Sequence, residues 1–165
     1  MQGDPLLDSD HITRYCGASQ INEDGTISGA TFRLREGESY LSVNWLEFLE
    51  LGNREAESSE IRRVLSSKLG IGTKAKIGVL NVSELRRYIF AESPDGRDLQ
   101  VRHQPEPDDP SHSGVFNVEM DDDLIADLIT ENVRESYPAK VQLDWSEIRR
   151  KIALDRHSNT RAATK

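Results

Sequence analysis

The residues with the clearest chemical potential lie in one short segment, 103–112, which reads HQPEPDDPSH. It holds two imidazoles and several carboxylates, and three prolines restrict its backbone. Imidazole nitrogens and carboxylate oxygens are ligands for zinc and other divalent ions, and the same groups act as general acids and bases. The catalytic candidates are His103, Asp108, Asp109 and His112. Of these, His103, Asp108 and His112 are also the candidate metal ligands.

The spacing of these residues matches no established metal or catalytic motif. The sequence has no HExxH pattern, no pair of cysteines, no G-x-S-x-G elbow and no glycine-rich phosphate loop. A charged connector between two strands, stiffened by prolines, explains the same composition without any chemistry. We expect that explanation to hold, with no bound metal and no cofactor.

Cys16 is the sole cysteine, and it can act as a nucleophile only if a histidine lies within hydrogen-bonding reach. His11 is on the same predicted strand, but the strand period of two places it on the opposite face from Cys16. A pairing with His103 or His112 across the fold stays open. A lone cysteine is more often a small buried apolar residue, which is our expectation here.

Charge is distributed unevenly along the chain, whose net charge is −8. Residues 92–123 contain ten acids and two arginines. The net charge of this segment is −8, which equals the net charge of the whole chain. Residues 145–165 are basic instead. This acidity and an aromatic content of only 6% make nucleic-acid binding an unfavourable hypothesis. The arginines that could still form a basic face are Arg33, Arg35, Arg62, Arg63, Arg86 and Arg87.

The run of acids at 121–123 also invites a metal interpretation. It precedes an amphipathic stretch, and carboxylates in the first turn of a helix interact favourably with the free N–H groups there. We therefore assign this run to helix capping.

Hydrophobic periodicity predicts strands and helices in irregular alternation. Strands are predicted at 11–16, 31–35, 41–45, 76–82, 99–103 and 114–118, with a brief extended segment at 141–145. Helices are predicted at 45–49, 54–69, 83–89, 121–136 and 144–152. The strand at 76–82 is apolar on both faces, which indicates a central position in the sheet.

This order of elements lacks a regular strand–helix–strand rhythm, which favours an α+β fold with a mixed or antiparallel sheet and about four to five helices. The length of 165 residues fits a single compact domain. We place that domain at residues 11–154. A disordered lead-in at 1–10 precedes it, and a frayed basic tail at 155–165 follows it.

Several short motifs in this sequence resemble a family of small, uncharacterised bacterial proteins. They are RYC at 14–16, DG at 24–25, SGATF at 28–32, LSVNWLE at 41–47 and HQPEPDDPSHSG at 103–114. The resemblance covers about residues 11–118. It implies a bacterial cytosolic origin and a common fold, and it implies no activity.

Together these observations favour a non-enzymatic protein-interaction module of a bacterial multi-gene system, of the defence or toxin-control type. We expect a cytoplasmic location, because no apolar run could span a membrane and a single cysteine suits a reducing compartment. The partner would be another protein, encoded nearby. Its predicted contacts are Glu106, Asp108, Asp109, Trp145, Arg149 and Arg150. The first alternative is a metal-dependent hydrolase or group-transfer enzyme using 103–112, and the second is a nucleic-acid binder acting through the arginines.

Overall fold

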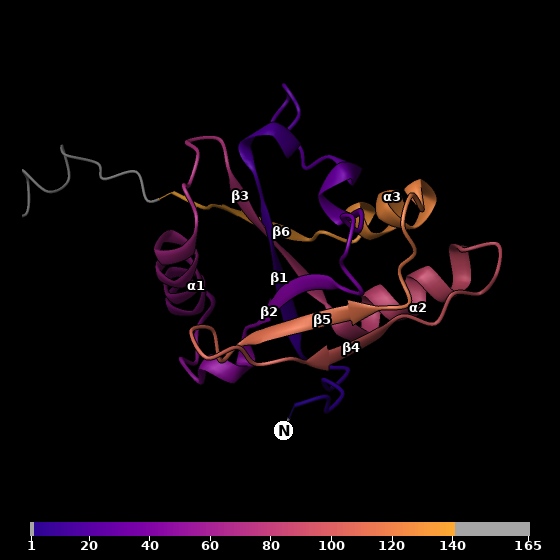
Figure 1. The fold of residues 1–165 in the computed structure, drawn as a ribbon, viewed down its shortest axis with the longest axis horizontal. Coiled ribbons are helices and arrows are strands. Elements are labelled where there is room, and N and C mark those ends of the chain that lie inside the picture. Colours follow the sequence, from indigo (N-terminus) through magenta and orange to yellow (C-terminus); the bar gives the residue numbers. More distant parts are fainter. Residues whose placement is uncertain (1, 141–165) are drawn as a thin grey trace, which may run out of the picture.

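A six-stranded sheet forms the centre of the protein (Figure 1). The computed structural model describes residues 2–140. The strands are β1 (His11–Cys16), β2 (Leu41–Trp45), β3 (Lys76–Asn81), β4 (Gln100–His103), β5 (His112–Phe116) and β6 (Glu135–Pro138), in the spatial order β4-β5-β2-β1-β3-β6. All neighbouring strands are antiparallel. The predicted α+β class is therefore confirmed, and the sheet is the antiparallel one of the two alternatives.

Three α-helices occur within residues 2–140: α1 (Arg54–Lys68), α2 (Val82–Glu92) and α3 (Asp123–Glu131). The prediction of four to five helices is wrong for this part of the chain. The helix expected at 45–49 is only a short 3-10 turn, η3 (Glu47–Leu49), which ends where Glu50 adopts a left-handed conformation with φ of 51°. The segments predicted at 141–145 and 144–152 lie outside the described residues.

Each α-helix begins where a side-chain oxygen accepts a hydrogen bond from a free N–H group of its first turn. Asn53 caps α1 in this way, at 2.9 Å from the backbone nitrogen of Ala56. Asn81 is the last residue of β3 and caps α2, since its Oδ1 accepts a hydrogen bond from the backbone nitrogen of Glu84. Asp122 caps α3, in agreement with the capping role assigned to the acids at 121–123.

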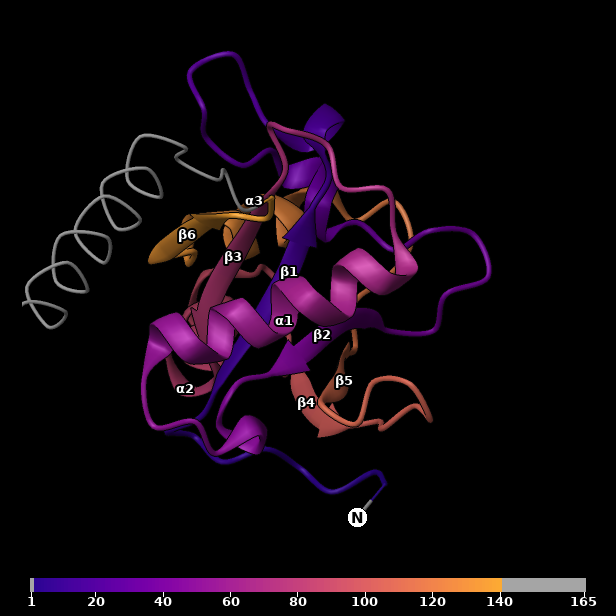
Figure 2. The same ribbon diagram turned by 90° about the vertical axis from the view of Figure 1, so that its left-hand side faces the viewer.

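The helices α2 and α3 lie on one face of the sheet, and α1 lies on the other (Figure 2). We call these the α2/α3 face and the α1 face. Side chains alternate between the two faces along each strand. On the α2/α3 face, strand residues such as Ile12 and Leu80 share one large apolar core with Ile89 of α2 and Ile129 of α3. A 3-10 turn, η2 (Gly29–Phe32), packs on α3 and completes this face.

The α1 face has a smaller apolar core. Its members are Leu46, Ile61, Leu65, Ala75, Ile77, Val79 and Ala139. Polar groups are buried on the same side of the sheet: the hydroxyl groups of Thr13 and Ser58 have no hydrogen-bond partner among the described residues, and Glu57 is buried on α1. The contact between α1 and the sheet is therefore smaller and more polar than the contact made by α2 and α3.

The sheet is incompletely closed between β1 and β2. These strands pair at only two positions, ending at Thr13 and Asn44, whereas β1 pairs with β3 along its whole length. Residues 14–16 of β1 and 41–43 of β2 therefore border an unpaired gap, which we call the seam. The guanidinium of Arg14 bridges the seam, because its Nη1 donates a hydrogen bond to the carbonyl oxygen of Ser42 at 2.6 Å.

The strand predicted at 31–35 is wrong, because this stretch contains the turn η2. Ser28 caps the turn, and Phe32 is buried in the core below it. Alternation of apolar and polar residues favoured a strand, but Gly29 lies against α3. A Cβ added at Gly29 would meet Oδ1 of Asp127 at 2.0 Å, so close packing of backbone on α3 replaces strand pairing here.

The helix predicted at 121–136 ends early, at Glu131. Asn132 is the C-cap of α3, and its side-chain nitrogen donates a hydrogen bond to the carbonyl oxygen of Leu128 at 2.9 Å. The next residues then pair with β3 as β6. The free edge of β3 offers backbone hydrogen bonds to this segment, and tertiary pairing overrides the helical pattern.

The lead-in predicted at 1–10 is also corrected, since residues 3–6 run along the outer edge of β4. The backbone nitrogen of Gly3 donates to the carbonyl oxygen of His103 at 2.7 Å, and that of Leu6 donates to Val101 at 3.0 Å. Leu6 is buried in the apolar core. The exposed edge of β4 and the apolar Leu6 together fix this segment.

The described residues form one domain around this sheet. The basic tail predicted at 155–165 lies outside them. None of the helices between residues 2 and 140 combines the length and hydrophobicity that a bilayer crossing requires.

Candidate functional site

The two histidines of the 103–112 segment lie on opposite faces of the sheet. His103 is paired with Ser113 across β4 and β5, and directly paired residues share a face. His112 is the next residue along β5, so its imidazole is on the other side, the α1 face. The structure therefore does not bring these two candidate metal ligands together.

His103 is held in place by contacts that fix the loop between β4 and β5. Its Nε2 lies 2.8 Å from the carbonyl oxygen of Pro110, and because a carbonyl only accepts, Nε2 is the donor. The ring packs against Trp45 and Phe48, at centroid distances of 5.4 and 4.9 Å. These contacts favour a structural role for His103.

Asp109 is the buried centre of the loop, with 4% of its surface exposed. Both of its carboxylate oxygens accept from the side-chain nitrogen of Asn44 at 2.9 Å, and Oδ1 also accepts from the hydroxyl of Ser111 at 2.9 Å. Asn44 belongs to β2. This network fastens the loop to the middle of the sheet.

Lys68, at the end of α1, forms ion pairs with three acids of the loop. Its Nζ lies 3.1 Å from Glu106, 3.2 Å from Asp108 and 3.7 Å from Asp109. Burial alone would lower the pKa of Lys68, but the hydrogen bonds that it donates to Glu106 and Asp108 outweigh burial and raise this pKa. The same bond from Lys68 holds the pKa of Asp108 below its usual range. Three of the predicted partner contacts are thus already engaged within the chain.

His112 has one ring nitrogen fixed and the other available. Its Nδ1 lies 2.8 Å from the carbonyl oxygen of Gln104, so Nδ1 carries the proton and Nε2 is left as the acceptor in the neutral ring. Nε2 lies 3.7 Å from a carboxylate oxygen of Glu106. The ring also approaches Tyr40, at a centroid distance of 6.0 Å.

Cys16 is fully buried on the α2/α3 face. Burial raises the pKa of its thiol to about 11, so the thiol is protonated at neutral pH. Its sulfur lies 3.4 Å from the backbone oxygen of Arg14, and His112 lies on the opposite face of the sheet. This environment suits a small apolar core residue. Within residues 2–140, no group of three or more histidine, cysteine or acidic side chains is arranged to hold a metal ion.

A hollow of about 310 Å³ lies beside α1. We call it the α1 hollow. It is lined by Arg14, Tyr15, Arg35, Glu38, Ser42, Asn44, Leu65, Lys68, Leu69, Glu106, Asp109 and His112. Three predicted residues, Glu106, Asp109 and His112, therefore reach one hollow, while His103 lies outside it. Sequence reasoning missed Arg14, although an arginine inside an otherwise apolar and β-branched strand is an unusual choice that marks the position.

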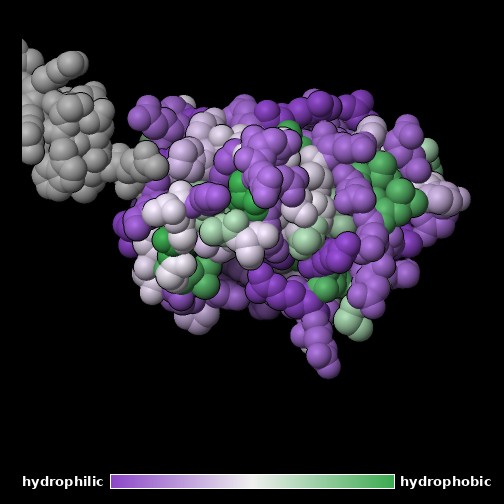
Figure 3. Space-filling view, turned by 90° about the horizontal axis from the view of Figure 1, so that it is seen from above, coloured by the Kyte–Doolittle hydropathy of each residue, from purple (hydrophilic) through white to green (hydrophobic). Residues whose placement is uncertain are grey.

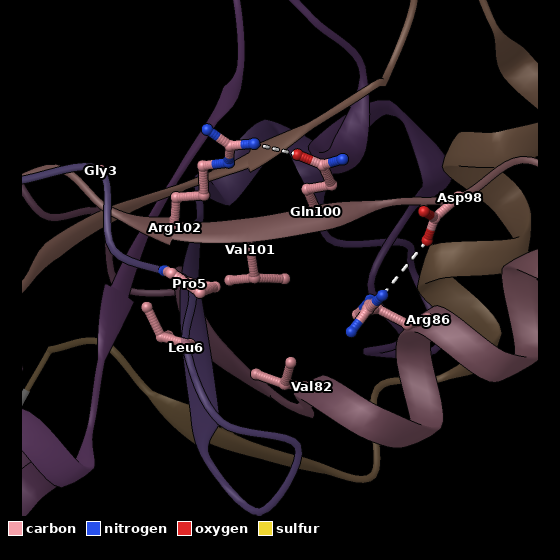
Figure 4. A pocket seen from close by; sticks show the side chains of 9 residues that line it. All are labelled: Gly3, Pro5, Leu6, Val82, Arg86, Asp98, Gln100, Val101 and Arg102. Atoms are coloured by element: carbon pink, nitrogen blue, oxygen red, sulfur yellow. Dashed lines mark hydrogen bonds and ion pairs between the residues drawn. The ribbon is translucent and has the colours of Figure 1, made fainter.

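A second hollow, of about 350 Å³, lies between the N-terminal segment, α2 and β4 (Figure 4). Its apolar side chains are those of Pro5, Leu6, Val82 and Val101. Arg86 and Asp98 form an ion pair of 3.3 Å at one end, and Figure 4 shows the side chain of Arg102 on the far side of β4. The charged residues that line this hollow are Arg86, Asp98 and Arg102.

Exposed apolar side chains and carboxylates occur together at the start of α3. Met120 is 58% exposed and Leu124 is 47% exposed, and the acids Glu119, Asp121 and Asp123 surround them in sequence and are exposed. We call these five residues the acidic–apolar surface. The left-handed backbone of Asp121, with φ of 62°, shapes the turn between them.

Cations only partly balance the acids of this surface. Arg33 pairs with Asp123 at 2.8 Å, and Arg97 lies between Asp95, Glu119 and Asp122. Asp121 makes no ion pair with any residue of the described part. Five carboxylates here therefore face two guanidinium groups, and the surface is negative.

The arginines proposed for nucleic-acid binding do not share one surface. Arg62 and Arg63 lie on α1, and Arg86 and Arg87 lie on α2, on the opposite side of the sheet. Several are engaged within the chain, for example Arg63 with Glu60. The predicted partner contacts Trp145, Arg149 and Arg150 lie outside the described residues.

Comparison with known proteins adds no relative. No protein-family model matches the sequence, and neither a curated protein nor a solved structure is significantly similar to it. Function is therefore argued from the geometry of this chain.

Proposed function

We propose that this protein is a non-enzymatic protein-interaction module that binds a basic partner protein through the acidic–apolar surface. The observation that carries the proposal is the exposure of Met120 and Leu124 within a group of carboxylates. Exposed apolar side chains surrounded by charge are typical of recognition surfaces, in which the apolar groups supply affinity and the charges steer the approach. That the partner belongs to a bacterial multi-gene system remains a prediction from the sequence.

On the face shown in Figure 3, apolar side chains form small separate patches within a mainly hydrophilic surface. The acids Glu106, Asp108 and Asp109, predicted as partner contacts, are held within the chain by ion pairs with Lys68, and Asp109 is buried. The unbalanced negative charge at the start of α3 is better placed to meet a partner.

The test uses a fluorescent amphipathic peptide of Lys and Leu and a second peptide in which Glu replaces every Lys. The full chain should bind the basic peptide and not the acidic one, and added salt should weaken the binding. Changing Glu119, Asp121 and Asp123 to their amides should weaken binding by about tenfold, as expected when three exposed charge pairs are lost. Met120→Ser and Leu124→Ser should weaken it at any salt concentration.

The matched control changes three exposed acids elsewhere, Glu23, Glu36 and Glu55, to Gln. This variant has the same net charge as the amide variant but keeps the acidic–apolar surface. An equal loss of binding in both variants, or equal affinity for both peptides, would contradict the proposal.

An enzyme is the second candidate, favoured by one observation: Glu106, Asp109 and His112 line the same hollow, and Nε2 of His112 can accept a proton. The test is hydrolysis of p-nitrophenyl phosphate and p-nitrophenyl acetate. The candidate requires turnover that His112→Gln abolishes and His103→Gln preserves. If the unaltered protein hydrolyses neither ester, this candidate fails.

A further inference from the structure

Arg14 is a buried cation without a counterion among the described residues. It is only 6% exposed, and burial lowers its pKa, although a guanidinium remains charged. Its two hydrogen bonds go to neutral backbone oxygens, those of Thr31 at 3.1 Å and Ser42 at 2.6 Å. Within residues 2–140, no carboxylate lies within 4 Å of it. Such a charge is unfavourable in a protein interior unless something compensates it.

The guanidinium also has donors to spare. It carries five N–H groups in a planar fork, and the two bonds to Thr31 and Ser42 use two of them. Strand alternation places Arg14 on the same face as Ile12 and Cys16, and its guanidinium lines the α1 hollow from the seam, where it bonds to Ser42. A ligand in the hollow therefore meets a preorganised, partly desolvated cation.

The lining of the hollow carries three cations and three carboxylates, and only Arg35 and Glu38 among the other charged groups act on Arg14. Lys68 is occupied by the acids of the 103–112 loop. Arg35 forms no ion pair with the described residues, and Glu38 accepts the backbone N–H of Arg35. Arg14 and Arg35 thus face a single carboxylate, that of Glu38. Leu65 of α1 and Leu69, the residue that follows this helix, supply an apolar wall.

We propose that the α1 hollow binds a small molecule through an oxyanion group, a phosphate or a carboxylate, held by Arg14. The planar fork of arginine matches both groups, since each presents two oxygens to parallel N–H donors. A volume of about 310 Å³ suits a small metabolite with a compact, partly apolar body. This site uses none of the residues of the acidic–apolar surface, so it stands or falls independently of the docking proposal.

The experiment titrates the full chain with sodium phosphate and, separately, sodium acetate, and follows the melting temperature and amide chemical shifts. Sodium chloride at equal ionic strength is the reference. We expect saturable binding of at least one of the two anions. A response to phosphate alone assigns a phosphate-bearing ligand, and a comparable response to acetate assigns a carboxylate.

Two variants test the place of binding. Arg14→Met should abolish the saturable response, and Arg14→Lys should weaken it by about tenfold or more, because the fork is lost while the charge stays. Leu69→Trp should narrow the hollow from the exposed end of α1 and weaken binding as well, which keeps the test valid if Arg14→Met does not fold. The controls are Arg63→Met, at an exposed arginine of α1, and Leu51→Trp.

Arg14 also bridges the seam, and a purely structural role would lower the stability of the variants without any dependence on the anion. The decisive quantity is therefore the anion-dependent shift in each variant. The proposal is overturned if neither anion binds saturably, or if Arg14→Met and Leu69→Trp respond as the unaltered chain does.

Discussion

The two faces of the sheet differ in how they are covered. The α2/α3 face buries a continuous apolar core that two helices, η2 and the strands share. The α1 face has a smaller core, buried polar groups, and a hollow bordered by charged side chains. The chain thus combines one face with a large apolar core and one with a smaller core, and a hollow borders each of them.

The largest expected difference between the faces comes from a matched pair of substitutions. Ile89 of α2 and Ile61 of α1 are both buried isoleucines on helices. Ile89→Ala should lower the free energy of unfolding by about 3–5 kcal/mol, in the upper range for such a cavity, and Ile61→Ala by about 2–3 kcal/mol, because Ile61 belongs to the smaller apolar core. Urea denaturation of both variants measures the difference. Equal losses would show that the faces are equally well packed.

A second pair tests whether the polar loop contributes stability on the α1 side. Asp109→Ala removes the carboxylate that accepts from the buried Asn44 and Ser111, leaves Asn44 only the hydroxyl of Ser111, and should cost about 2–4 kcal/mol. Asp108→Ala, at a neighbouring exposed acid, should leave the free energy of unfolding nearly unchanged. Denaturation at neutral pH compares the two. A small effect of Asp109→Ala would mean that the loop is not fastened through this network.

The burial of Cys16 on the α2/α3 face predicts that the free energy of unfolding depends on pH. Its pKa is raised from 9.0 to about 11, so the folded state keeps the thiol proton longer than the unfolded state does. Stability due to the buried thiol is therefore complete below pH 9 and declines between about pH 9 and 11, by roughly 2–3 kcal/mol in total.

The measurement is the difference in unfolding free energy between the unaltered chain and Cys16→Ala at each pH from 8 to 11. Subtraction removes the titration of tyrosines and lysines, which both proteins share. The difference should shrink as the pH rises. A constant difference would show that the thiol is not desolvated.

The smallest expected effect concerns Gly114, a close-packed point on the α1 side of β5. A Cβ there would meet Cδ2 of Tyr40 at 2.5 Å, whereas a Cβ at Gly70 would meet nothing within 4 Å. Gly114→Ala should cost about 1–3 kcal/mol through overpacking, and Gly70→Ala should cost nothing measurable. Thermal unfolding distinguishes them. If Gly114→Ala does not change the stability, β5 is not closely packed at this position.

Local patterns predicted most of the regular elements. β-Branched and aromatic residues located β1, a continuous apolar run located β3, and the spacing of Ile61, Val64 and Leu65 located α1. The predictions failed in two segments whose conformation is set by contacts with distant parts of the chain. The turn η2 forms where Gly29 packs on α3, and β6 forms where it pairs with the free edge of β3. Neither contact leaves a periodic signal in its own segment.

The candidate site was only half predictable. The 103–112 segment was identified as the chemically richest part of the chain, but β5 begins at His112, two residues before the predicted strand. That extension places His112 on the face opposite His103. The importance of Arg14 depends on the seam, and strand pairing of this kind cannot be derived from one strand alone.

The borders of the sheet limit how the protein can associate. Residues 3–6 already hydrogen-bond to β4 on its outer side. At the other border, β6 ends in Pro138, which lacks an N–H group, and its carbonyl oxygen is taken by Nε of Arg62 at 2.8 Å. Edge-to-edge aggregation of copies into extended ribbons is thereby discouraged. We therefore expect a partner protein to contact side chains and not free strand edges. Its affinity would then depend on individual side chains, which substitutions can change without altering the backbone.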